Sequence, residues 1–142
     1  MRSIVAIGVG VLVLGALALS AQAATYTIAP DKVEAQKIYF GSPKGFDKPG
    51  KVDYEKVIKA TPEYRQVRKK RIQVGTGKYW ILLSQASDRA VRAIAEVGQE
   101  TDYDFIAASG YLASLEPAIP AEDVTQLVLN KLRPKKKKRP RK

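Results

Sequence analysis

Residues 79–100, YWILLSQASDRAVRAIAEVGQE, carry the strongest helical pattern of the sequence. Apolar side chains recur every three or four residues, and charged side chains occupy the opposite face. The apolar positions are Leu83, Ala86, Ala90, Ile94 and Val97, and the charged positions are Asp88, Arg89, Arg92, Glu96 and Glu100. The pattern predicts an amphipathic helix. Ser87 and Asp88 offer an alternative helix start, which would leave the first residues as a separate turn.

A second helix is predicted just upstream. Thr61-Pro62-Glu63 combines an N-cap residue, a proline at the first helical position and an acid in the first turn. Residues 75–77, Gly-Thr-Gly, then break the pattern, and they lack the G-x-x-x-x-G-K-[ST] spacing of a phosphate-binding loop. The sequence therefore predicts an antiparallel helical hairpin over about residues 54–100, with a joint at Pro62.

The flanking segments indicate short strands and a last helix. Residues 103–115 predict two short strands with a tight connection, and residues 121–132 predict a helix that opens at Ala121-Glu122-Asp123. Residues 24–51 contain many Gly and Pro residues, so this segment is expected to be weakly ordered, with a loop at 41–51. The fold class expected is α+β.

The composition excludes several chemistries. The chain has no Cys and no His, so Ser-His and Cys-His nucleophiles and Cys/His zinc sites are excluded. We expect Asp102 and Asp104 to be solvent-exposed residues at the start of a strand, and Asp123 to cap a helix or lie in its first turn. We therefore expect no enzyme activity, no metal site and no cofactor.

Both ends of the chain carry distinct signals. Residues 1–23 combine Arg2, an apolar run and an Ala-Gln-Ala cleavage site, which predicts a cleaved signal peptide and export to the periplasm. The alternative is an uncleaved membrane anchor, for which the apolar run is short. Residues 134–142, PKKKKRPRK, predict a disordered tail, because like charges and prolines cannot pack. The body between these segments is nearly neutral, so the net charge of +11 belongs mainly to the tail.

Two groups of residues are candidates for binding. The anion-binding candidates are Arg65, Arg68, Lys69 and Lys70 in the helix, and Lys135, Lys136, Lys137, Lys138, Arg139, Arg141 and Lys142 in the tail. The helical group is either a solvated face or an anion-binding face. The client-binding candidates are Tyr79, Trp80 and Ile81. Tyr79 and Trp80 either pack between the two helices or form an exposed aromatic tip.

The order of motifs resembles the Skp/OmpH family of periplasmic chaperones. Val52-Asp53, Lys56-Val57 and Thr61-Pro62-Glu63 match the family's first motif, and Ala93-Ile94, Val97 and residues 103–106 match the second. Asp123-Val124-Thr125 and the apolar positions of 127–132 match the third. The resemblance spans about residues 51–132, and the domain is assigned to residues 52–133.

The resemblance implies a trimer in which short strands form a central oligomerisation body and helical hairpins project as arms. Such a protein would be an ATP-independent holdase for unfolded outer-membrane proteins, and its basic residues would attract lipopolysaccharide. The hairpin is shorter than family arms, and residues 46–51, FDKPGK, stand where the family has an apolar strand. The alternative is an envelope adaptor tethered to lipopolysaccharide or anionic lipid by its basic tail. A nucleic-acid binder would require residues 1–23 not to be a signal peptide.

Overall fold

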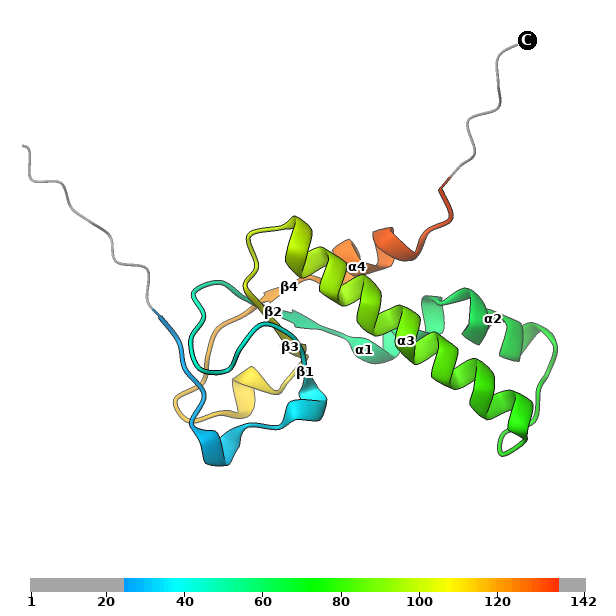
Figure 1. Ribbon diagram of the computed structural model, residues 1–142, viewed down its shortest axis with the longest axis horizontal. Helices are drawn as coiled ribbons and strands as arrows, with labels where there is room; N and C mark the ends of the chain where they lie inside the picture. The colour runs from blue at the N-terminus through cyan, green and yellow to red at the C-terminus, as the bar shows by residue number, and fades with distance from the viewer. Residues whose placement is uncertain (1–24, 136–142) are drawn as a thin grey trace, which may run out of the picture.

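The computed structural model describes residues 25–135, and the predicted signal peptide and residues 136–142 of the predicted tail lie outside this range. A four-stranded mixed sheet lies at one end of the molecule (Figure 1). Its strands are β1 (Ile38–Phe40), β2 (Pro49–Val52), β3 (Phe105–Ala108) and β4 (Glu122–Asp123), in the order β1-β3-β2-β4. β2 runs parallel to β3 and β4, and β1 runs antiparallel to β3. Together with the helices, this sheet confirms the predicted α+β class.

Four α-helices accompany the sheet. They are α1 (Tyr54–Ala60), α2 (Pro62–Lys69), α3 (Gly77–Glu100) and α4 (Thr125–Leu132). Thr61 caps α2 by accepting a hydrogen bond from the Tyr64 N–H at 3.2 Å, and Thr76 caps α3 by accepting one from the Tyr79 N–H at 3.2 Å. The predicted helix start at 61–63 is confirmed. α3 runs unbroken through Ser87, so the alternative start there is wrong.

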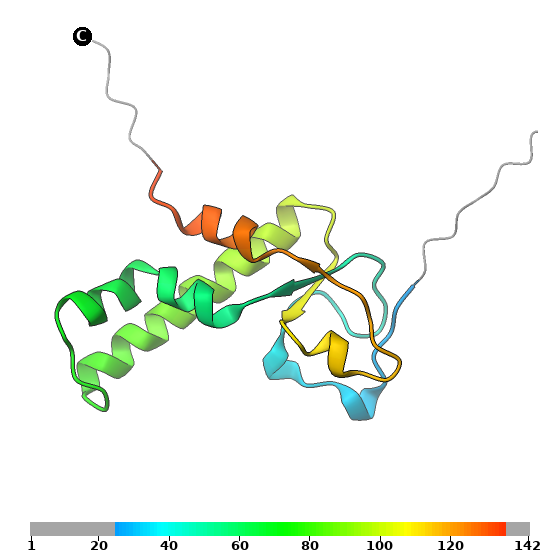
Figure 2. The ribbon, with the colours of Figure 1, turned by 180° about the vertical axis from the view of Figure 1, so that it is seen from behind.

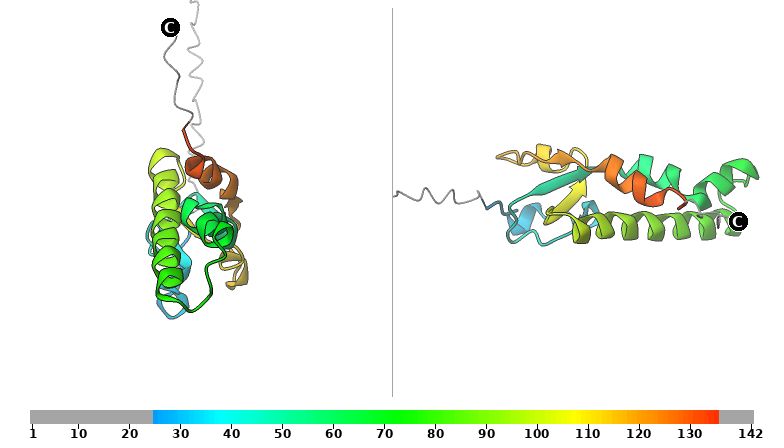
Figure 3. Two further views of the ribbon diagram at one scale, coloured as in Figure 1. Left: turned by 90° about the vertical axis from the view of Figure 1, so that its right-hand side faces the viewer. Right: turned by 90° about the horizontal axis from the view of Figure 1, so that it is seen from above.

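The helices form two layers. Seen from above, α3 forms one layer, and α1, α2 and α4 together form a second layer that packs along α3 (Figure 3). One core fills the space between these helices and one face of the sheet. Its buried residues are Val52, Val57, Ala90, Ala93, Ile94, Val97, Ile106, Val124 and Val128. This core positions α1, α3 and α4 against each other and against the sheet, and α2 packs against α3 beside it.

A second core lies on the opposite face of the sheet, where the chain's N-terminal part and the 3-10 turns η1 (Pro30–Lys32), η2 (Ala35–Lys37) and η3 (Leu112–Ser114) pack (Figure 2). Its buried residues are Ile28, Phe46, Phe105, Ala107, Tyr111, Leu112 and Ile119. Phe105 and Ile106 point to opposite faces because side chains alternate along a strand. Both cores lie between residues 28 and 128, so a chain of residues 24–142 retains every core residue.

The prediction of a weakly ordered segment at 24–51 is wrong over the described residues. β2 is a central strand of the sheet, and Phe46 is buried. Pro49 stands at the first residue of its strand, where a missing N–H is tolerated. A Cβ on Gly50 would lie 2.9 Å from Val124, so glycine permits the close approach of that side chain.

Two boundaries after α3 also differ from the prediction. Only one strand, β3, occurs within 103–115, because residues 112–114 form the 3-10 turn η3. The last helix begins at Thr125, not at 121, because Glu122 and Asp123 pair with β2 as strand β4. Asp123 accepts a hydrogen bond from the Thr125 N–H at 2.8 Å, which fixes the turn between strand and helix.

Gly98 makes a close contact that a larger residue cannot keep. A Cβ at this position would lie within 3.0 Å of the Phe40 ring, which packs beside the first core. We expect Gly98→Ala to lower the free energy of unfolding, because an overpacking cost of about 1–3 kcal/mol exceeds a helix-propensity gain of about 1 kcal/mol. Gly77→Ala in the same helix is the control, since no atom lies within 4 Å of its Cβ position. Urea denaturation measures both; equal stabilities would contradict the packing argument.

Candidate functional site

Basic side chains from three helical segments surround one groove, which we call the basic groove. Its volume is about 890 Å³. The basic residues lining it are Arg65, Lys69 and Lys70 at the end of α2, Arg89 and Arg92 on α3, and Lys131 and Arg133 at the end of α4. Glu96 is the only acidic residue among the lining residues. The groove is therefore a cationic surface on which a negatively charged ligand can contact several basic side chains at once.

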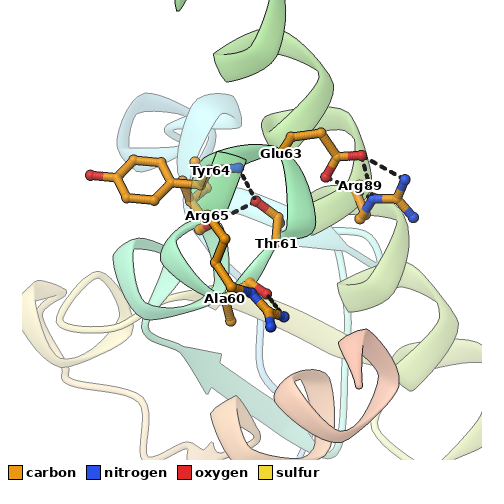
Figure 4. A network of polar contacts seen from close by, with 7 residues as sticks. Ala60, Thr61, Glu63, Tyr64, Arg65 and Arg89 are labelled. Carbon is orange, nitrogen blue, oxygen red and sulfur yellow. Dashed lines mark hydrogen bonds and ion pairs between the residues drawn. The ribbon is translucent and has the colours of Figure 1, made fainter. Parts of the chain in front are cut away.

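Helix geometry explains how the groove is assembled. Arg65 and Lys69 are four residues apart on α2, and Arg89 and Arg92 are three apart on α3, so each pair lies along one helix flank. The Nη2 of Arg65 donates a hydrogen bond to the Ala60 carbonyl at 2.7 Å, which holds this side chain back along α2 (Figure 4). Lys131 forms an ion pair with Glu100 that joins the end of α4 to the end of α3.

Arg89 is held by a bidentate ion pair. Its Nε lies 2.8 and 2.9 Å from the two Glu63 carboxylate oxygens, and its Nη2 lies 2.6 Å from Oε1 (Figure 4). The hydrogen bonds from Arg89 lower the pKa of the Glu63 carboxyl below its ordinary value. This pair connects the first turn of α2 to α3 and fixes one wall of the groove.

The structure brings together only some of the predicted anion-binding residues. Arg65, Lys69 and Lys70 line the basic groove, whereas Arg68 is exposed and is not among the lining residues. Lys135 is exposed at the end of the described range, one residue beyond the groove-lining Pro134. The remaining tail candidates lie outside the described residues. Sequence reasoning missed Arg89 and Arg92, although their spacing places them on one side of α3.

The end of the helix pair that lies away from the sheet carries exposed apolar residues, which we call the apolar tip: Val74, Trp80 and Ile81. Their exposed fractions are 77%, 56% and 61%. Tyr79 is partly buried and meets Trp80 edge to face, with ring centroids 5.2 Å apart. Trp80 is therefore not packed between the two helices.

Asp102 and Asp104, which precede β3, have structural partners. Asp104 accepts hydrogen bonds from the Asp47 and Lys48 N–H groups at 2.7 and 2.8 Å, which ties the start of β3 to the segment before β2. Asp102 pairs with the Lys48 ammonium at 2.7 Å. Between residues 25 and 135 there is no group of three or more acidic, His or Cys residues able to hold a metal ion. Within the same range, no helix has the length and hydropathy of a membrane span.

No family model, curated protein or solved structure matches this chain. The resemblance to the Skp/OmpH family therefore stays a prediction from the motifs quoted above. Function has to be argued from the basic groove and the apolar tip.

The Glu63–Arg89 pair predicts a measurable pH dependence. Because the folded-state pKa of Glu63 is lowered, the pair stabilises the fold above the unfolded-state pKa and loses this effect as pH falls through the folded-state value. We expect the pair to contribute about 0.5 kcal/mol to the free energy of unfolding, because half of the Arg89 side chain is exposed and solvent screens the interaction. We expect the stability difference between wild type and Glu63→Gln to shrink between about pH 5 and pH 3. Thermal unfolding across this range measures it, and a constant difference would contradict it.

Proposed function

We propose that this protein is a non-enzymatic adaptor that binds phosphate-rich polyanions through the basic groove. The observation that carries the proposal is the convergence of seven basic side chains from α2, α3 and the end of α4 around one groove. A polyanion with phosphates at several positions would contact more of these cations than a single small anion would. Binding by many such contacts is strongly salt-dependent.

The distribution of charge over the domain supports this proposal. Residues 64–87 contain six basic residues and no acidic residue. The rest of the described range contains twelve basic and fourteen acidic residues. The domain is thus positive around α2 and the start of α3, and slightly negative elsewhere. A polyanion is steered toward this positive segment, which supplies Arg65, Lys69 and Lys70 to the groove, and the predicted tail follows the groove in the sequence and adds cations.

In this proposal, the polyanion belongs to the bacterial envelope, because residues 1–23 predict export to the periplasm. Lipopolysaccharide and anionic lipids are the phosphate-bearing surfaces expected there. The trimer implied by the Skp/OmpH resemblance would multiply the number of grooves that face one surface. Neither a metal nor a cofactor is required for such binding.

A holdase for unfolded outer-membrane proteins is the second candidate, and the exposed apolar tip favours it. The dimensions of the helices favour the adaptor. α2 has eight residues and α3 has twenty-four, so their lengths are roughly 12 and 36 Å. Much of α3 packs against the sheet and α4, which leaves a short stretch to act as an arm. Arms of this length are too short to enclose a large client.

The first experiment compares two chains, residues 24–142 and residues 24–135, for binding to fluorescently labelled linear polyphosphate. Both retain the groove, and the shorter chain lacks most of the predicted tail. We expect both to bind, with an affinity that falls linearly with salt on logarithmic axes. The shorter chain should show a shallower slope, because fewer cations take part. If residues 24–135 do not bind, the tail and not the groove is the binding device, and the proposal is wrong.

A further inference from the structure

We propose that the apolar tip inserts into the interfacial region of an anionic lipid bilayer, so that the phosphate-rich surface recognised by this protein is a membrane. The inference rests on the proposed function, because the cations of the basic groove bring the domain to that surface. It adds a second contact, made by Val74, Trp80 and Ile81. The ligand is then a lipid with an anionic headgroup and not a soluble polyphosphate.

The exposure of the tip is the first observation. Val74, Trp80 and Ile81 occur within eight consecutive residues and are the three most exposed large apolar residues of the described chain. Val74 lies in the turn between α2 and α3, and Trp80 and Ile81 lie in the first turns of α3, at the far end of the two helices from the sheet (Figure 1). A Cβ placed on Gly75 or Gly77 would meet no atom within 4 Å, so the turn stands clear of the rest of the domain.

The charge around the tip is the second observation. Lys70, Arg71 and Lys78 flank the three apolar residues and are all exposed, and no acidic residue occurs from 64 to 87. Apolar and aromatic side chains surrounded by Lys and Arg are the composition of segments that lie in a membrane interface. Tryptophan in particular favours this region, because its ring is apolar and its N–H is polar.

The shape of the tip favours a lipid surface over a polypeptide. Recognition of a peptide segment needs a groove or a free sheet edge into which the segment fits. The tip projects at the end of the helix pair, and none of the cavities described within residues 25–135 is lined by Val74, Trp80 or Ile81. A projecting apolar turn with a cationic border can enter a bilayer interface without any partner pocket.

The turn also holds its conformation before it meets a membrane. Thr76 caps α3 and donates its hydroxyl to the Gln73 carbonyl at 2.8 Å. Gly75 has a φ of +88°, a conformation that glycine adopts without strain. The Ile72 N–H donates a hydrogen bond to the Val67 carbonyl at 3.0 Å. Insertion would therefore require little ordering of the backbone.

Trp80 is the only tryptophan of the chain, so its fluorescence reports on the tip without a label. Residues 24–142 are mixed with phosphatidylcholine vesicles that contain or lack phosphatidylglycerol. With phosphatidylglycerol, we expect Trp80 emission to shift to shorter wavelength and to be quenched by lipids brominated near the headgroup end of the acyl chain. Without phosphatidylglycerol, we expect neither effect.

Variants that keep Trp80 test the apolar contact. Val74→Asn combined with Ile81→Asn should lower partitioning into anionic vesicles by about tenfold or more. Val91→Asn is the matched control, because Val91 is an exposed apolar residue of α3 outside the tip, and it should partition like wild type. The double variant should still bind soluble polyphosphate, which separates a failure of insertion from a failure of the groove.

Three results would overturn the inference. Vesicle binding with unchanged Trp80 emission would leave the groove or the tail as the contact and place the tip outside the membrane. Binding to polyphosphate without binding to anionic vesicles would exclude the lipid as ligand. A blue shift that appears with a denatured polypeptide but not with vesicles would assign the tip to a protein client.

Discussion

Reversing one charge on each helical wall of the basic groove, with Lys69→Glu and Arg92→Glu, is expected to weaken polyphosphate binding by residues 24–135 at least about a hundredfold. Lys69 lies on α2 and Arg92 on α3, and both line the groove. One basic contact with an anionic surface is worth about 1 kcal/mol, and a reversed charge adds repulsion to the lost attraction. Two reversals should therefore remove more than about 2.8 kcal/mol, which corresponds to the hundredfold loss.

The control has to change the net charge equally while leaving the groove intact. Lys32→Glu combined with Lys44→Glu does so, because both residues are exposed and neither lines the groove. If binding depended on net charge alone, the two double variants would bind equally weakly. We expect the control to bind within a few-fold of wild type. Fluorescence anisotropy measures both affinities, and circular dichroism checks that each variant is folded.

The helices could be predicted because the residues that determine them are neighbours in the sequence. Thr61, Pro62 and Glu63 act within one turn, and the apolar face of α3 is visible from its spacing alone. The strand β2 was missed because its partners lie far away in the chain. Gly50 pairs with Ile106 and packs against Val124, and nothing in residues 46–51 indicates either contact.

The candidate site was predicted only in part for the same reason. The basic residues of α2 were identified as a possible anion-binding face, but the same pattern also describes a solvated helix flank. The choice between an anion-binding face and a solvated flank depends on Arg89 and Arg92. The packing of α2 against α3 brings these two residues to the same groove. Lys131 and Arg133 join them because α4 also packs on α3. The first core sets the packing of α4 on α3, and its long-range pairs are not visible in any local motif.

Substitution of Phe46 tests whether the N-terminal part of the domain unfolds cooperatively with the rest. Its side chain is 2% exposed, and its ring stacks on Phe105 with centroids 4.1 Å apart. Phe46 also exchanges two backbone hydrogen bonds with Tyr26, at 2.7 and 2.9 Å, and its ring contacts the Tyr26 ring. Removal of this side chain would open a cavity in the second core, between the N-terminal part and β3.

We expect Phe46→Ala to lower the free energy of unfolding by about 3–5 kcal/mol, a large share of the total stability of a small domain. Phe46→Leu should cost less, about 1–2 kcal/mol, because it keeps part of the buried volume. Urea denaturation followed by circular dichroism measures both. A loss below about 1 kcal/mol for Phe46→Ala would mean that the packing of the N-terminal part against β3 adds little to the cooperative fold. A loss of the expected size would instead make this segment, which sequence patterns assigned to weak order, a requirement for the sheet that supports the basic groove.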